Sequence, residues 1–148
     1  MKKLIFVFIA GLLVSTAAFA QSQTSAQKRM ALLPEMRSDT QYVVYFRFAY
    51  STLNPAAEKF LVDVSKNYKT QAPSKIRVAG YADTIGSDKV NMAISLRRAK
   101  NVANALNKNG VPSSKITVKG YGETNLAVPT ADEVMEPRNR RAVINFVK

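Results

Sequence analysis

The strongest constraint on the fold is an internal repeat. Residues 74–84 recur at 114–124 with Ser, Lys, Ile, Val, Gly, Tyr and Thr in the same places and a carboxylate before the Thr. Each copy reads as a strand, and the helical pattern between them stops at Asn109-Gly110, with Pro112 just beyond. A strand–helix–strand unit of this size makes a right-handed crossover, so the two copies are predicted to be parallel strands.

The flanking segments complete a mixed sheet. Gln41 to Ala49 is rich in aromatic and β-branched residues and predicts a first strand, and residues 142–147 predict a last one. Asn54-Pro55 is typical of a helix start. The first helix is then indicated by apolar residues at helical spacing, ending before a proline: Ala57, Phe60, Leu61, Val64, Tyr68 and Pro73.

With a short third helix possible over residues 131–136, the element order is β-α-β-α-β-(α)-β. This order predicts an α/β fold of the α+β type, in which a four-stranded mixed sheet is covered by helices on one face. The order of the strands within the sheet is left open.

The N-terminus predicts export. Lys2 and Lys3 precede an apolar run over residues 4–14, and Ala18-Phe19-Ala20 ends it, so residues 1–20 are typical of a cleaved signal peptide. The run is shorter than the ~20 residues of a membrane-spanning helix, which disfavours an uncleaved anchor. Residues 21–40 are polar and predict a tether, and residues 41–148 one domain.

The absence of cysteine and histidine narrows the chemistry. Disulfides, thiolate nucleophiles, imidazole bases and the usual zinc ligands are all excluded, as is a lipid-bearing cysteine after the signal peptide. We therefore expect neither a metal nor a cofactor, and binding rather than catalysis.

A polar cluster is predicted where the second strand meets the long helix that begins near Ser87 or Asp88. Asn91, Ser95 and Arg98 fall on the same helical face as the later apolar residues, close to the turn that carries Asp83. Such groups need partners. One interpretation is a structural network in which Asp83 pairs with Arg98 and Asn91 holds the turn. The other is a pocket for a zwitterionic ligand, with its carboxylate on Arg98 and its ammonium on Asp83.

Several spaced motifs, in order along residues 42–148, resemble the OmpA C-terminal, peptidoglycan-associated domain family. They are Gly80-Tyr-Ala-Asp-Thr-Ile-Gly, Asn91-Met-Ala-Ile-Ser, Arg98-Ala99, Val102, Leu106, Gly120-Tyr-Gly-Glu and Asn139-Arg-Arg-Ala-Val-Ile. The resemblance implies non-covalent binding of peptidoglycan through the diaminopimelate of the stem peptide. It also implies a periplasmic place in the cell envelope, associated with the outer membrane or cell wall.

The resemblance also implies the binding residues. Asp83 and Arg98 match the positions that hold diaminopimelate in that family. Thr84, Gly86 and Asn91 match its turn and helix start. Arg140 matches the Asn-Arg-Arg segment and either lines the pocket or is a solvated charge. Tyr81 and Ala82 depart from the family pattern beside Asp83. Without a β-barrel or lipobox the chain resembles a small soluble member, for which an outer-membrane or envelope-complex protein is a possible partner.

The net positive charge and the carboxylates of Asp83 and Glu123 suggest two alternatives to peptidoglycan binding. The formal net charge is +12, and +10 once Lys2 and Lys3 leave with residues 1–20, so the protein is expected to adhere to polyanions. Nucleic-acid binding is disfavoured because no base-reading motif is present. Asp83 and Glu123 could act as paired carboxylates in glycan cleavage, but Arg98 would keep Asp83 ionised and unfit as an acid.

Overall fold

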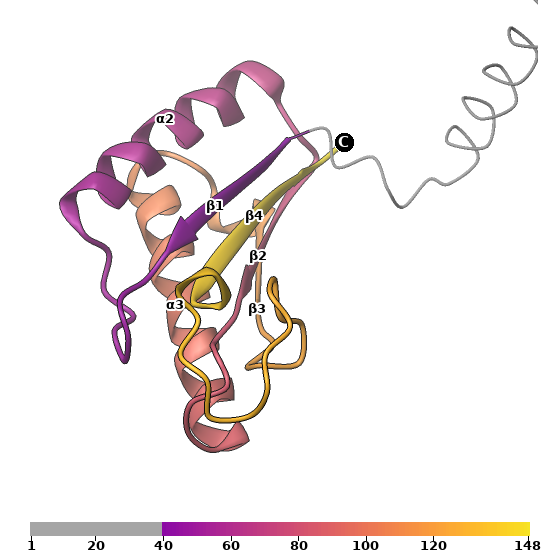
Figure 1. Ribbon diagram of the computed structural model, residues 1–148. Coiled ribbons are helices and arrows are strands. Elements are labelled where there is room, and N and C mark those ends of the chain that lie inside the picture. Colours follow the sequence, from indigo (N-terminus) through magenta and orange to yellow (C-terminus); the bar gives the residue numbers. More distant parts are fainter. Residues whose placement is uncertain (1–39) are drawn as a thin grey trace, which may run out of the picture. The chain divides into compact units, whose positions relative to one another are not determined.

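The computed structural model describes residues 40–148, which form a four-stranded sheet with two long helices (Figure 1). The predicted signal peptide and most of the predicted tether lie outside these residues. The elements are β1 (Gln41–Tyr45), α2 (Pro55–Gln71), β2 (Lys75–Gly80), α3 (Asp88–Lys108), β3 (Ile116–Gly120) and β4 (Arg141–Val147), with short 3₁₀ helices at Ser113–Lys115 and Pro137–Asn139.

The sheet has the strand order β1-β4-β2-β3. β2 and β3 are parallel and pair Ile76 with Ile116 and Gly80 with Gly120, so the two copies of the sequence repeat lie side by side in the same register. β4 is antiparallel to both of its neighbours, β1 and β2. The predicted mixed sheet and crossover are therefore confirmed, and the last strand of the chain occupies the middle of the sheet.

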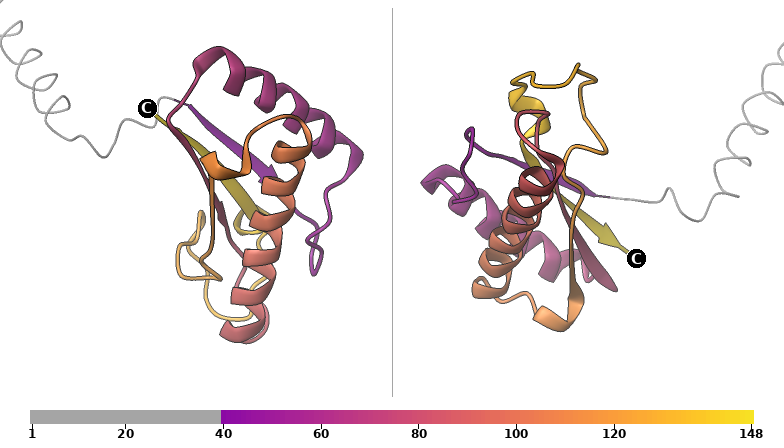
Figure 2. Two further views of the ribbon diagram at one scale, coloured as in Figure 1. Left: turned by 180° about the vertical axis from the view of Figure 1, so that it is seen from behind. Right: turned by 90° about the horizontal axis from the view of Figure 1, so that it is seen from below.

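Both helices lie on one face of the sheet, as the two views of Figure 2 show. α2 begins where predicted, because the Asn54 side chain accepts a hydrogen bond of 2.7 Å from the amide of Ala57 and Pro55 opens the helix. Buried aliphatic residues of the two helices and the sheet form the core, among them Leu61, Val64, Ile76, Val78, Val102, Leu106 and Ile144.

The glycine that ends each copy of the repeat allows α3 to approach the sheet. A Cβ at Gly80 would lie 1.9 Å from the carbonyl oxygen of Ser95, and one at Gly120 would lie 2.7 Å from the amide of Leu96. No side chain fits at such separations, so glycine is required at both positions. This contact brings the polar first turns of α3 against the ends of β2 and β3.

Two predicted elements differ from the structure. β1 ends at Tyr45 instead of reaching Ala49, because the chain then leaves the sheet and Ala49 adopts a left-handed conformation with φ of 59°. Residues 131–136 are turns and not a helix. The Thr84 hydroxyl binds the backbone of Ala131 and Val134 in this segment, and these contacts replace the hydrogen-bond ladder of a helix.

Candidate functional site

The site lies where the turn between β2 and α3 meets two other segments. Residues 81–87 form this turn, residues 46–50 follow β1, and Asn139 and Arg140 precede β4. β1 and β2 are the two neighbours of β4, and this brings three stretches that are distant in sequence together at one end of the sheet. Asp83, Thr84, Asn91, Arg98 and Arg140 are all buried there.

Asp83 pairs with Arg140. The Arg140 Nη1 atom donates to Asp83 Oδ2 at 3.0 Å, and the two side chains are 8% and 5% exposed. Arg140 Nε also donates to the carbonyl of Phe46 at 3.2 Å. The alternative that Arg140 is a solvated charge is wrong, and so is the structural alternative in which Arg98 is the ion-pair partner of Asp83.

Arg98 is held by backbone carbonyls. Its guanidinium, on a residue 1% exposed, donates to Tyr50, Tyr81 and Arg47 at 3.0, 2.9 and 3.3 Å and lies 5.3 Å from the Phe46 ring centroid. The pKa of Arg98 is lowered to about 10, because burial lowers it more than the nearby Asp83 raises it and Arg140 adds to the lowering. The side chain remains a cation at neutral pH. Within residues 40–148 three of its five N–H groups donate hydrogen bonds, which leaves two for other acceptors.

Asp83 and Arg98 line one cavity of about 350 Å³, which we call the Asp83 cavity. Its other walls are residues 48–49 after β1, Ala82, Ile85, and the first turns of α3 at Val90, Asn91, Ala93, Ile94 and Arg97. Within residues 40–148, Asp83 Oδ1 accepts no hydrogen bond. Arg140 is not one of the wall residues, but its guanidinium behind Asp83 and that of Arg98 outnumber the one carboxylate and leave a net positive charge, with both an acceptor and donors available.

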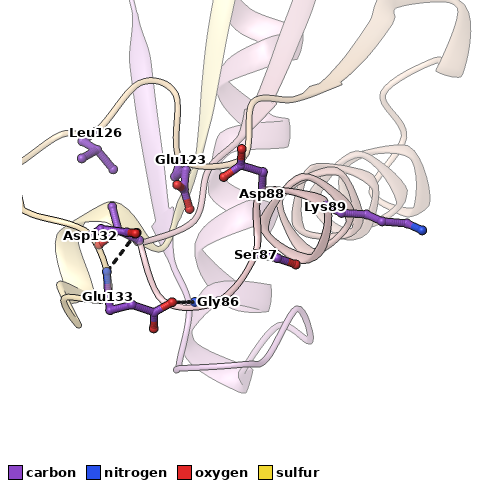
Figure 3. Close-up of a pocket in the computed structure, with 9 residues that line it drawn as sticks. Gly86, Ser87, Asp88, Lys89, Glu123, Leu126, Asp132 and Glu133 are labelled. Carbon is purple, nitrogen blue, oxygen red and sulfur yellow. Dashed lines mark hydrogen bonds between the residues drawn. The ribbon is translucent and has the colours of Figure 1, made fainter.

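Thr84 and Gly86 lie on the other side of the turn. They line a second, open depression with Ser87, Asp88, Lys89, Glu123, Leu126, Asp132 and Glu133, shown in Figure 3. The Gly86 amide donates to Glu133 Oε1 at 3.2 Å, and the Thr84 hydroxyl holds residues 131–134. These two residues fix the turn that presents Asp83, and the Gly86 amide, two residues before α3, already donates to a carboxylate of the protein.

Asn91 connects the two depressions. Its side-chain amide donates to Glu123 and to the carbonyl of Gly86, so Asn91 holds the turn as the structural interpretation expected. It also lines the Asp83 cavity. Ser95 on the same helical face accepts a 2.8 Å hydrogen bond from the Gly122 amide. The buried polar stripe predicted from helical periodicity is thus present, and each of its members has a partner in another segment.

Of the predicted site residues only Asp83, Asn91 and Arg98 line the Asp83 cavity, and Phe48, Ala49 and Arg97 are among its wall residues that were not predicted. Phe48 and Ala49 come from a segment that was interpreted as strand, and Arg97 is an exposed cation beside Arg98. Because Arg97 is adjacent to the predicted site residue Arg98 in the sequence, Arg97 could have been included in the candidate site. Nothing in the periodicity of residues 46–50 indicates that their carbonyls accept from Arg98.

The sequence model of the OmpA family matches residues 45–140 of this chain. An outer membrane protein from Gluconacetobacter diazotrophicus is 34% identical over 109 residues, which is 70% of this chain and 29% of that protein. Outer membrane protein A from Shimwellia blattae is 36% identical over 105 residues, 69% of this chain and 42% of that protein. The chain belongs to the OmpA family, and it spans less than half the length of these relatives.

Solved structures agree on the fold. The OmpA-like domain of FopA1 from Francisella tularensis superposes with a TM-score of 0.64 at 27% identity, covering 71% of this chain and 70% of that one. The peptidoglycan-associated lipoprotein from Burkholderia pseudomallei gives a TM-score of 0.65 at 23% identity, covering 78% and 97%. The α/β architecture with a mixed sheet is that of OmpA-like domains. This family is known for peptidoglycan association, and its domains are not typical enzymes.

Two features are absent from the described part of the chain. Between residues 40 and 148, no helix is long and apolar enough to cross a bilayer. In the same span, no group of three or more acidic side chains is placed to hold a metal ion.

Proposed function

We propose that the protein binds peptidoglycan non-covalently, through the diaminopimelate residue of the stem peptide seated in the Asp83 cavity. The observation that carries the proposal is that Asp83 and Arg98, buried charges of opposite sign, line one cavity of about 350 Å³ with hydrogen-bonding capacity left over. Membership of the OmpA family supports the same conclusion.

A zwitterionic amino-acid end matches this arrangement. Its carboxylate would accept from the two unused N–H groups of Arg98, and its ammonium would donate to Asp83 Oδ1. Asp83 is already neutralised by Arg140, so the cavity keeps one excess positive charge for the ligand carboxylate. Arg140 therefore acts on the ligand through Asp83, and Thr84, Gly86 and Asn91 act by holding the turn.

A glycan hydrolase with Asp83 and Glu123 as its two carboxylates has less support. Asp83 lines its own cavity and is paired with Arg140, whereas Glu123 lines the other depression and accepts from Asn91. The two groups thus do not flank a common space.

The proposed location is the periplasm, in contact with the cell wall or the outer membrane. The signal-peptide pattern of residues 1–20 and the outer-membrane names of the relatives support it. An outer-membrane or envelope-complex partner fits the same location. A generic polyanion binder is the remaining alternative, given the basic composition.

The test of the proposed function is co-sedimentation with purified peptidoglycan sacculi as salt is raised. Close contacts inside a buried cavity are screened less than long-range attraction, whose Debye length is ~8 Å at 0.15 M salt. We therefore expect capture by sacculi to fall only in part while retention on heparin is lost. Loss of both in step would identify a generic polyanion binder, and release of soluble muropeptides in the same tube would identify a hydrolase.

A further inference from the structure

The face of the sheet that the helices leave uncovered carries a cluster of cations. In β2 the exposed Lys75 and Arg77 alternate with Ile76 and Val78, which are buried against the helices. Lys119 of β3 is exposed as well, and Arg141 of β4 is half-buried. Figure 2 shows both helices on the opposite side. We call Lys75, Arg77, Lys119 and Arg141, with the strand residues between them, the open sheet face.

Tyrosines position two of these cations at one end of the sheet. The Arg141 guanidinium lies 4.0 Å from the centroid of the Tyr81 ring, and Lys119 Nζ lies 4.6 Å from that of Tyr121. The two rings stack on each other at 5.4 Å with an angle of 9° between their planes. Because the ring faces are engaged with each other and with cations, they are not free to stack on nucleic-acid bases.

The cations of the open sheet face lack carboxylate partners within residues 40–148. The ion pairs there are Lys66–Asp63, Arg138–Glu136 and Arg140–Asp83, and none involves the open sheet face. None of the four strands contains an Asp or Glu. Several acidic residues gather instead around the turns at one end of the sheet: Asp88, Glu123, Asp132 and Glu133. In this part of the chain the open sheet face therefore has no compensating carboxylate. Lys75, Arg77 and Lys119 are exposed to solvent, whereas Arg141 also donates to the backbone carbonyls of Asn125 and Asn139.

We propose that the open sheet face docks on an anionic phospholipid surface. Its cations are spread over three adjacent strands, with neighbouring strands ~4.8 Å apart and successive outward residues ~7 Å apart along each strand. A two-dimensional array of this kind matches the headgroup phosphates of a membrane surface better than the single line of charges on a polymer. Each Lys or Arg close to an anionic bilayer strengthens binding about fivefold.

Docking through this face leaves the Asp83 cavity accessible. The cavity walls include Val90, Ala93 and Ile94 of α3, which packs on the other face of the sheet. The protein can thus hold a membrane on one side and a ligand on the other. The membrane docking stands without the proposed function, and only the bridging of membrane to cell wall rests on it.

The experiment is co-sedimentation of the full protein, as the cell processes it, with vesicles of phosphatidylglycerol and phosphatidylcholine in equal parts. Vesicles of phosphatidylcholine alone give the background. The test variant is Arg77→Glu/Lys119→Glu on the open sheet face, and the matched control is Lys59→Glu/Lys100→Glu on exposed helix positions. Both variants change the net charge equally and have the same processed N-terminal segment before Thr40 as the natural protein, so any contribution of that segment cancels.

The expected result is binding to the anionic vesicles only, with a loss of at least about twentyfold for the sheet variant. The helix variant should stay within about threefold of the natural protein, since its charges face away from the membrane. Equal losses in both variants would show that net charge alone attracts the protein and would overturn the proposal. A sheet variant that loses binding to single-stranded DNA but keeps binding to vesicles would also overturn it, in favour of a nucleic-acid surface.

Discussion

Asp83→Asn is expected to lower the free energy of unfolding by about 3–5 kcal/mol. The substitution keeps the size of the side chain but removes the negative charge between two guanidiniums. Arg140 and Arg98, 7% and 1% exposed, would then be buried cations facing each other without a carboxylate. Urea unfolding followed by circular dichroism measures the change, which corresponds to a fall in Tm of roughly 10 °C or more.

The double variant Asp83→Asn/Arg140→Met is the control for this result. It removes the stranded Arg140 cation together with its partner, so it should be more stable than Asp83→Asn alone, with a coupling energy of about 1–3 kcal/mol. Stability of Asp83→Asn within about 1 kcal/mol of the natural protein would contradict the assignment of Asp83–Arg140 as a buried ion pair.

Arg98→Lys is expected to weaken capture by sacculi about tenfold to a hundredfold. Lysine keeps the charge but cannot offer the guanidinium fork, and hydrogen bonds to charged groups contribute about 1.5–3 kcal/mol each. The same change removes donors to the carbonyls of Tyr50, Tyr81 and Arg47, so it is also expected to lower Tm. Binding therefore has to be measured well below the Tm of the variant.

A second variant separates binding from stability. Ala93 is exposed and lines the Asp83 cavity, so Ala93→Leu should fill part of the cavity and weaken capture about tenfold, with Tm changed by only a few degrees. Ala56→Leu makes the same change at an exposed helix position, in α2 and outside the cavity, and should bind normally. Equal capture by the two variants would place the ligand elsewhere.

The parts of the fold predicted from sequence are those set by local pattern. The repeat at 74–84 and 114–124 predicts the parallel pair β2–β3, and helical periodicity places Asn91, Ser95 and Arg98 on the buried face of α3. Asn54-Pro55 and Asn109-Gly110 mark helix ends within a residue of those observed. Helical periodicity and helix ends depend on a few neighbouring residues, and the repeat is found by comparing two segments of the sequence, so none of these signals requires knowledge of tertiary contacts.

The parts missed from sequence depend on distant contacts. The ion pair of Asp83 joins residues 57 apart, and it forms because β4 lies between β1 and β2, an order that no periodicity indicates. The helix expected over residues 131–136 is absent because Thr84, 47 and 50 residues away from its partners, binds the backbone of that segment. Arg98 likewise finds acceptors 48 and 51 residues earlier, at Tyr50 and Arg47, and Arg47 lies in a loop that was expected to be strand.

The central claim, that the Asp83 cavity holds diaminopimelate, is tested most directly by competition. The protein is bound to sacculi, and free diaminopimelate or free cadaverine (1,5-diaminopentane) is added at equal concentrations. Cadaverine is diaminopimelate without its two carboxylates, so it keeps both ammonium groups but has no zwitterionic end for Asp83 and Arg98 to hold. We predict that diaminopimelate releases the protein and that cadaverine does so at least about tenfold less effectively. Release by both compounds alike, or by neither, would contradict the claim.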